Sequence, residues 1–407
     1  MTTKPSLNPS YAPYFGQLNN ELKLVGGGRP RLVLDLDALD HNLSQMKKNW
    51  PANTQFRLVI KSLPCIELLQ YIAHQMGSMN FMAFHQPFLN QIVQVFPKGN
   101  LLLGKPLPLA AVSEFYQLHQ SNPTAFNPDS QLQWLIDTSE RLQQYLTLAQ
   151  QQQRRFQINI EVNIGLQRGG VNANSTLDSL LTTIQRHPEH LKLTGLMGYD
   201  AHVGKLPGFI ESRNTSYRKS QARLKGYLEY VQQNYPQLVP SEGLTINGAG
   251  SPTIEIHKQQ SQCNDLSAGS CLVKPANFDL ATLQDYQPAC FIAAPVIKTL
   301  PGFALPGPEI ISKPLQRIHQ RFGQTFFIYG GDWKARLTSP KGLYENPIYG
   351  SSANQAIVNG AKSINLAPDD HIFFRPKESE AVFLQFGRIL AVRKGRKEAD
   401  WPVLQQP

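Results

Sequence analysis

The stretch Phe56-Arg57-Leu58-Val59-Ile60-Lys61 is an apolar, β-prone run, broken only by Arg57, that ends in a lysine. It predicts a buried strand that carries an amine to its C-terminal edge. In a barrel of alternating strands and helices, the active site lies at that edge. A lysine held there is partly desolvated, which favours the neutral, nucleophilic form of its amine. The alternative is a Lys61 side chain that only extends from the strand end into solvent.

Runs typical of strands recur at a fairly even spacing along the chain, with helical stretches between them. Eight strands are predicted, over residues 56–61, 79–84, 100–103, 132–137, 157–164, 192–199, 244–247 and 265–271. Segments with the amphipathic spacing of helices lie at 66–76, 87–95, 110–120, 139–152 and 176–185. Alternating strands and helices form a parallel sheet. Eight such units therefore predict an α/β fold, a (β/α)8 TIM barrel.

The alternation stops near residue 285. Short runs separated by Pro and Gly turns follow at 293–298, 324–329, 371–374, 382–386 and 389–392, which predicts an all-β domain. We therefore expect an N-terminal lead-in over 1–28, a barrel over 29–285 and a C-terminal β domain over 286–407. The early run 31–36 can be the first strand of the barrel domain or can join the β domain.

Composition describes an ordinary soluble protein of 407 residues, 41% hydrophobic and 17% charged. Its net charge of +10 is diffuse, apart from Arg393-Lys394-Gly395-Arg396-Lys397. Because no nucleic-acid motif accompanies this charge, we expect anionic small molecules rather than nucleic acid as partners. The four cysteines form no CxxC pair. No run approaches the about 20 apolar residues of a membrane helix, and the N-terminus lacks an apolar segment, so a cytoplasmic location without membrane contact is expected.

Three further strand ends carry residues suited to ligand binding. The fifth predicted strand enters a Gly-rich turn, Gly165-Leu166-Gln167-Arg168-Gly169-Gly170, in which Arg168 can hold an oxyanion or only brace the turn. The seventh leads into Gly248-Ala249-Gly250-Ser251-Pro252-Thr253, which can cradle a phosphate with backbone N–H groups, although a Gly-rich turn needs no ligand. After the sixth, Tyr199 and His202 are expected at the barrel mouth, where either can stack on a flat ring or move a proton.

Together these strand ends supply an amine, a guanidinium, an aromatic ring, an imidazole and a phosphate cradle. That combination suits a pyridoxal phosphate site. The cofactor needs a lysine to bind its aldehyde, a partner for its phenolate, a contact to its ring and an anchor for its phosphate.

With these features the chain resembles the fold-type III pyridoxal phosphate enzymes, which have the alanine racemase-like fold. Within them it is most similar to the D-threonine aldolase and D-serine dehydratase branch. Five features occur in that family's order: Asp35-Leu36-Asp37-Ala38-Leu39 with Asn42, the Lys61 strand end, the 165–169 turn with Arg168, the 248–253 loop, and Leu266-Ser267-Ala268-Gly269-Ser270.

The resemblance implies roles for particular residues. Lys61 bonds covalently to the cofactor, Arg168 contacts its phenolate side, and Gly248, Ala249, Gly250 and Ser251 hold its phosphate. It also implies a head-to-tail homodimer in which the β domain of one chain closes the site of the other.

The sequence departs from this branch at two places. The branch usually has a histidine two residues before its lysine, where this chain has Val59. It also usually has a C-terminal metal motif, Pro-x-His-x-Cys or Pro-x-His-x-Asp, where this chain reads Pro376-Lys377-Glu378-Ser379-Glu380. If the prolines align, Glu378 and Glu380 stand at the metal positions and favour Mg2+ or Mn2+ over Zn2+. The alternative is that no metal binds.

The resemblance implies a pyridoxal-phosphate-dependent lyase that acts on a small D-amino acid carrying a β-hydroxyl group. Lys61 or His202 would act as the base, for aldol cleavage or for elimination. The first alternative is an amino acid racemase, whose second base would come from the partner chain; Tyr329, Tyr344 and Tyr349 lie in the expected β domain. The second alternative is a non-catalytic pyridoxal-phosphate-binding relative, against which the long β domain argues.

Overall fold

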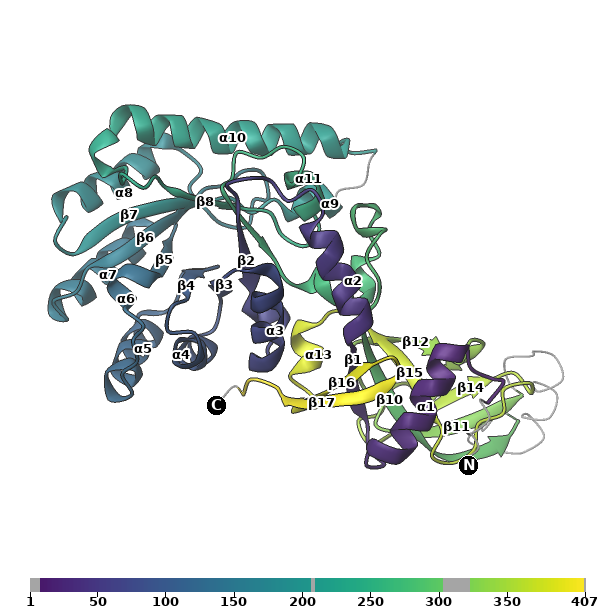
Figure 1. The fold of residues 1–407 in the computed structure, drawn as a ribbon. Coiled ribbons are helices and arrows are strands. Elements are labelled where there is room, and N and C mark those ends of the chain that lie inside the picture. The colour runs from purple at the N-terminus through teal and green to yellow at the C-terminus, as the bar shows by residue number, and fades with distance from the viewer. Residues whose placement is uncertain (1–7, 206–208, 303–322, 406–407) are drawn as a thin grey trace. The chain divides into compact units, whose positions relative to one another are not determined.

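The computed structural model describes residues 8–205, 209–302 and 323–405 (Figure 1). The chain divides into two compact units. The barrel unit comprises Leu43–Leu272, Leu280–Asp285 and Leu404–Pro407, and the β unit comprises Met1–Asn42, Val273–Asp279 and Tyr286–Val403. None of the helices in the described ranges is long and apolar enough to cross a lipid bilayer.

The barrel unit contains a closed barrel of eight parallel strands in sequence order. The strands are β2 (Gln55–Val59), β3 (Asn80–Ala83), β4 (Asn100–Leu103), β5 (Leu132–Ile136), β6 (Phe156–Glu161), β7 (Leu191–Met197), β8 (Thr245–Gly248) and β9 (Asp265–Ala268). Strand β2 pairs with both β3 and β9, which closes the ring. The predicted TIM barrel is confirmed, and each of the eight strands predicted for it overlaps an observed one.

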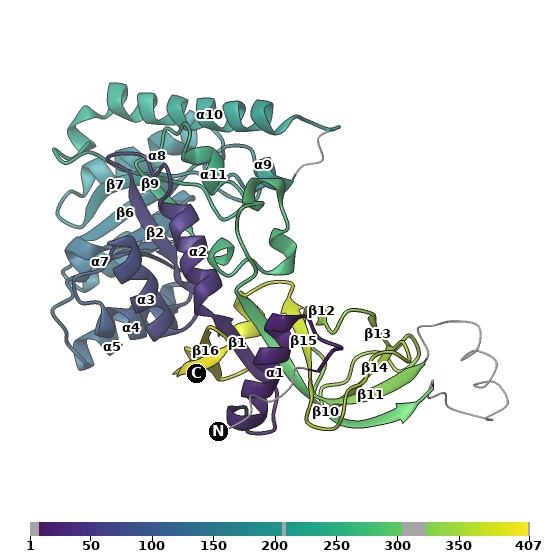
Figure 2. The ribbon, with the colours of Figure 1, turned by 45° about the vertical axis from the view of Figure 1, so that its right-hand side comes forward.

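Helices cover the outside of the barrel (Figure 2). They are α3 (Ile66–Met76), α4 (Gln86–Val95), α5 (Leu109–Ser121), α6 (Pro128–Gln131), α7 (Ser139–Gln151), α8 (Asn174–Arg186), α9 (Ala201–Lys205), α10 (Arg213–Asn234) and α11 (Ile254–His257). Short 3-10 turns are η1 (Ile60–Ser62), η2 (Pro236–Leu238), η3 (Ser270–Leu272) and η5 (Ala281–Leu283). Helix α3 turns an apolar stripe inward, with Leu68, Leu69 and Ile72 buried.

The barrel interior explains the single charge within the first strand. Arg57 is 2% exposed, and its guanidinium donates two hydrogen bonds to Asp265 on β9, at 2.8 and 2.7 Å. It also donates to the carbonyl oxygens of Phe81 and Asn100. A buried guanidinium is tolerated only when its charge and donors are satisfied in this way. Strand β2 ends at Val59, so position 61 follows in turn η1 at the C-terminal end of the barrel.

The β unit contains a sheet of nine strands, with the order β13-β14-β11-β10-β1-β16-β17 and with β15 pairing β10 and β12. The strands are β1 (Arg31–Asp35), β10 (Cys290–Pro301), β11 (Gln324–Tyr329), β12 (Ala335–Ser339), β13 (Leu343–Glu345), β14 (Gln355–Gly360), β15 (His371–Pro376), β16 (Arg388–Arg393) and β17 (Arg396–Pro402). Helices α1 (Pro13–Val25) and α13 (Glu380–Phe383) and turn η4 (Ala276–Phe278) complete it, and α2 (Leu36–Lys47) follows β1 along the chain. Strand β1 lies between β10 and β16.

The β unit differs from the predictions at some places and decides an alternative that they left open at another. The run at 382–386 is not a strand. Val382 and Phe383 are buried in helix α13, and the N–H of Phe383 donates a hydrogen bond to the carbonyl of Ser379 in this helical turn. Of the two alternatives for the run at 31–36, the structure shows the second: its strand pairs within the β sheet, and the barrel unit begins at Leu43. Residues 1–28 include helix α1, which buries Leu18 and Leu22.

Candidate active site

Lys61 lies in η1, directly after β2, at the C-terminal end of the barrel strands. Its Nζ is 4.3 Å from the centroid of the Phe84 ring, which follows β3. A Cβ at Gly104, after β4, would come within 2.1 Å of a Phe84 ring atom. Glycine at this position therefore allows the ring to lie beside the amine.

Arg168 and Tyr199 come together from neighbouring strand ends. The Arg168 guanidinium carbon is 5.0 Å from the centroid of the Tyr199 ring. The turn that carries Arg168 is held by Asn163, whose Oδ1 accepts from the N–H groups of Gly165 and Gln167 at 2.9 and 3.3 Å. Burial raises the pKa of the Tyr199 hydroxyl, and Arg168 acts in the opposite direction. The ring thus remains a neutral phenol that packs beneath a cation.

The 248–251 loop packs against the same tyrosine. A Cβ at Gly250 would lie 2.6 Å from Cε2 of Tyr199, and Ala249 has a positive φ of 65°. The Ser251 Oγ accepts from the N–H groups of Gly269 and Cys271, at 3.3 and 3.0 Å, which joins the ends of β8 and β9. Within the described ranges, no group accepts a hydrogen bond from the N–H groups of Ala249, Gly250 or Ser251.

These observations test whether the residues fit pyridoxal phosphate. Three consecutive N–H groups of buried residues, for which the described part of the chain provides no acceptor, can hold a phosphate. The amine of Lys61, the guanidinium of Arg168 and the ring of Tyr199 lie at the same end of the barrel. The donor set therefore fits the cofactor.

Replacing Gly250 by alanine is expected to strain the loop, because the added methyl group overlaps the buried Tyr199 ring. Overpacking of this kind lowers the unfolding free energy by about 1–3 kcal/mol. Urea unfolding measures the change. Gly226→Ala on α10 is the matched control, since nothing lies within 4 Å of its Cβ position, and it should be neutral or stabilising. Equal behaviour of the two variants would contradict the packing of Gly250 on Tyr199.

Two carboxylates at the mouth were not predicted. Glu161 ends β6 and Asp137 follows β5. Both carboxylates lie beside Gly169 in the Arg168 turn: a Cβ built on Gly169 would be 3.5 Å from Oδ2 of Asp137 and 3.6 Å from Oε2 of Glu161. Burial, together with Asp137, raises the pKa of Glu161 to about 7, against the opposing effect of Arg168. The sequence does contain a signal for Glu161. In the predicted strand every second residue faces the same side, and Glu161 is the acidic last member of the polar series Gln157, Asn159 and Glu161.

Glu161 is expected to make stability depend on pH. Its folded pKa of about 7 exceeds the value of 4.5 for an exposed glutamate, so the folded state binds the extra proton between these values. The unfolding free energy should therefore fall by about 3 kcal/mol as the pH rises from 4.5 to 7. Urea titrations across this range should show that Glu161→Gln removes the fall. Glu140→Gln, at an exposed site on α7, should keep it.

His202 lies on α9 and turns towards α10. Its Nε2 is 3.2 Å from Oγ of Ser220 and 2.8 Å from a Cβ placed at Gly165. Burial lowers its pKa, although Asp200 acts in the opposite direction. The imidazole therefore packs between the Arg168 turn and α10, and its hydrogen-bond partner is Ser220 of α10.

Glu378 and Glu380 are the two candidate metal ligands. Glu378 forms an ion pair with Lys334 at 2.8 Å, and Glu380 begins α13. In the part of the chain that the structure describes, no group of three His, Cys, Asp or Glu side chains is placed to hold a metal ion.

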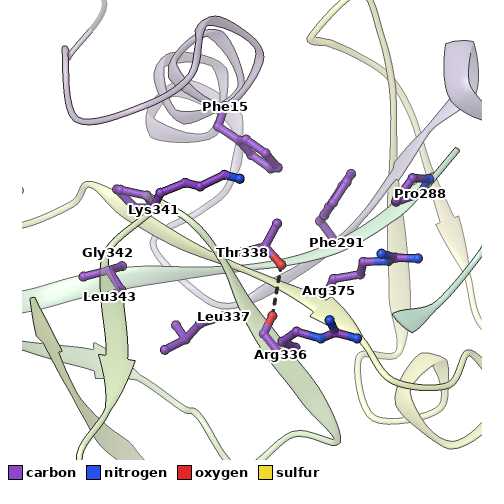
Figure 3. Close-up of a pocket in the computed structure, with 11 residues that line it drawn as sticks. Phe15, Pro288, Phe291, Arg336, Leu337, Thr338, Lys341, Gly342, Leu343 and Arg375 are labelled. Atoms are coloured by element: carbon purple, nitrogen blue, oxygen red, sulfur yellow. Dashed lines mark hydrogen bonds between the residues drawn. The ribbon is translucent and has the colours of Figure 1, made fainter. Parts of the chain in front are cut away.

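The β unit has a separate cavity of about 460 Å³ (Figure 3). Phe15 of α1, Phe291 of β10 and Lys341 line part of it, with Arg336 and Arg375 at one side. The Arg375 guanidinium is already held by Asp279, at 2.7 Å, and by the carbonyl of Lys274. None of the predicted site residues lines this cavity.

The family model for the alanine racemase N-terminal domain matches residues 34–276, which is more than half of the chain. The protein therefore belongs to this family, the fold-type III pyridoxal phosphate enzymes that the sequence resembles. A search of curated protein sequences finds no match.

Solved structures with the same fold cover nearly the whole chain. D-threonine aldolase from Filomicrobium marinum is 17% identical, with a TM-score of 0.70 over 92% of this chain and 94% of that one. D-threo-3-hydroxyaspartate dehydratase from Delftia sp. HT23 is 15% identical, with a TM-score of 0.67 over 93% and 97%. Alanine racemase from Bacillus anthracis is 11% identical, with a TM-score of 0.68 over 92% and 97%. At these identities the likeness establishes the alanine racemase-like fold.

Proposed function

We propose that this protein is a pyridoxal-phosphate-dependent lyase that acts on small D-amino acids with a β-hydroxyl group. The observation that carries the proposal is the position of the Lys61 amine at the C-terminal end of the barrel, the same end as Arg168, Tyr199 and the 248–251 loop. Family membership supports the cofactor. Two of the similar structures, a D-threonine aldolase and a D-threo-3-hydroxyaspartate dehydratase, support the reaction class.

Each residue of the site has a proposed task. Lys61 binds the cofactor covalently, the N–H groups of Gly248, Ala249, Gly250 and Ser251 bind its phosphate, and Arg168 contacts its phenolate side. The Tyr199 ring packs against the Arg168 guanidinium and against Gly250 of the phosphate loop. When bound, pyridoxal phosphate holds the substrate amine and withdraws electrons from the bonds at the α-carbon.

The proposed base is the Lys61 amine or the imidazole of His202. Burial favours neutral His202, which can accept a proton, but its Nε2 faces Ser220 on α10. Lys61 already lies at the mouth and is therefore the stronger candidate. Glu161, with a pKa of about 7, can hold or release a proton there at neutral pH.

The competing proposal is an amino acid racemase. It is favoured by the absence of the metal motif usual in the lyase branch; Glu378, which stands at a metal position if the prolines align, forms an ion pair with Lys334. A racemase needs a second base on the opposite face of the α-carbon. In a head-to-tail homodimer, which we also propose, this base would be a tyrosine of the partner's β unit. Tyr329, Tyr344 and Tyr349 are 48%, 38% and 46% exposed, so each is accessible to a second chain.

A panel of D-amino acids tests the reaction. The protein, loaded with pyridoxal phosphate, is incubated with D-threonine, D-serine, D-alanine and their L-enantiomers. Release of an aldehyde or of a 2-oxo acid from the D-β-hydroxy substrates supports the lyase. Exchange of the α-proton with inversion of D-alanine, without cleavage, would support the racemase instead. Failure of the protein to bind the cofactor would overturn both proposals.

The same assay, run with Mn2+ or with a chelator, tests the metal. Metal dependence that is lost in Glu378→Gln would support Glu378 as a ligand. Metal dependence that survives this substitution would place the metal elsewhere. Activity that changes neither with added Mn2+ nor with the chelator would support a metal-free reaction.

A further inference from the structure

Asp200 and His257 form a buried ion pair for which the proposed reaction has no use. Oδ2 of Asp200 is 2.7 Å from Nε2 of His257, and the two side chains are 0% and 1% exposed. Asp200 directly follows Tyr199, and His257 ends α11. Ion pairs removed from solvent to this degree are costly unless their remaining polar atoms are bonded. Here Nδ1 of His257 is 2.8 Å from Oγ of Ser261, and the other oxygen of Asp200 is also bonded.

Asp200 connects this pair to the 248–251 loop through one residue. Thr253 donates from Oγ1 to Oδ1 of Asp200 at 2.7 Å, and Thr253 is itself fully buried. The N–H groups of Thr253 and Ile254 both donate to the carbonyl of Gly250 at 2.9 Å. The carboxylate thus holds a threonine that in turn holds the carbonyl of the central loop residue.

The same carboxylate is tied to Tyr199 by the backbone. The Tyr199 ring lies against Gly250 on one side and under Arg168 on another. A displacement of Asp200 would therefore move Tyr199 and release Thr253 together. A closed connection results, from Asp200 through Thr253 and Gly250 to Tyr199 and back to Asp200.

We propose that Asp200, His257 and Thr253 are positioning residues that fix the orientation of the N–H groups of the 248–251 loop towards a phosphate. This inference rests on the proposed use of pyridoxal phosphate. Because the N–H groups of Ala249, Gly250 and Ser251 find no acceptor among the described residues, their orientation is not set by internal bonds of their own. Preorganised donors bind an anion more tightly than donors that must first be ordered.

The test separates phosphate binding from binding of the rest of the cofactor. Apo-protein is titrated with pyridoxal phosphate and with pyridoxal, which lacks the phosphate, and the ratio of the two dissociation constants is measured. Thr253→Val keeps the shape of the side chain but removes its donor to Asp200. It should weaken pyridoxal phosphate by about tenfold or more, as loss of a hydrogen bond to a charged group does, and leave pyridoxal nearly unchanged.

Thr194→Val is the matched control. Thr194 is buried in β7 and donates to the carbonyl of Ile158 at 3.0 Å, so the same substitution removes a buried hydrogen bond of the barrel wall away from the loop. It should leave the ratio unchanged. Thr253→Ser, which retains the hydroxyl, should restore the wild-type ratio. Thermal unfolding of each apo-variant verifies that it is folded, and Thr253→Ala replaces Thr253→Val if the latter is not.

The outcomes are distinct. A selective loss of pyridoxal phosphate binding in Thr253→Val supports the inference. An unchanged ratio, or equal weakening of both ligands, overturns it while leaving the proposed function intact. A wild-type protein that binds neither ligand overturns the proposed function and this inference with it.

Discussion

Replacing Lys61 by alanine is expected to reduce turnover by at least about 1,000-fold and to remove the visible absorbance of the cofactor-loaded protein. In our proposal this amine bonds covalently to the cofactor aldehyde, and its loss also removes the stronger candidate base. Absorbance spectra and single-turnover assays with D-threonine and D-serine measure both effects.

Lys105→Ala is the control for this prediction. Lys105 also follows a barrel strand, β4, but is exposed. Its removal should leave the spectrum unchanged. If the Lys61 variant retained the visible absorbance while the Lys105 variant lost it, the cofactor would be attached at Lys105, and our assignment of Lys61 would be wrong.

Replacing Asp200 by asparagine is expected to lower the unfolding free energy by about 3–5 kcal/mol, the usual cost of leaving one partner of a buried ion pair without the other. Burial alone would lower the pKa of His257, but the Asp200 carboxylate raises it to about 10. Burial alone would raise the pKa of Asp200, but the charge of His257 and the hydrogen bonds from His257 and Thr253 lower it. Urea unfolding measures the loss.

The pair also predicts a dependence on pH in alkaline solution. Since the folded pKa of His257 lies above the value of 6.5 for an unperturbed histidine, its stabilisation is complete below 6.5 and is lost as the pH rises towards 10. Wild-type stability should decline through this window, and the decline should largely disappear in Asp200→Asn. His187→Gln, at a partly exposed histidine, is the control and should retain it. A wild-type stability that is flat between these pH values would contradict a charged pair.

The barrel could be predicted from the sequence because its signals are local. Each strand is a short apolar run and each helix has a 3.6-residue stripe, so the regular alternation alone predicts the topology. That topology then gathers the strand ends, which is why Lys61, Arg168, Tyr199 and the 248–251 loop could be predicted to lie at one end of the barrel.

The remaining features depend on tertiary contacts. Asp200 and His257 are far apart in the sequence, and neither has a local pattern that marks it as buried and charged. The run 382–386 was wrongly predicted as a strand because a short apolar run does not distinguish a buried strand from one buried helical turn. Strand β12 was missed because only its ends are buried, so its sequence has no apolar alternation.

The position of β1 determines the order in which the protein can be completed during synthesis. Strands β2 to β9 are contiguous, so the barrel can close as soon as β9 has left the ribosome. Strand β1 is made first, but both its neighbours, β10 and β16, are made only after the barrel. Strand β1 therefore has no pairing partner until β10 and β16 are synthesised, and in that interval its exposed edges are prone to incorrect pairing. A fragment over 286–407 would lack this central strand, so no single cut of the chain yields two complete units.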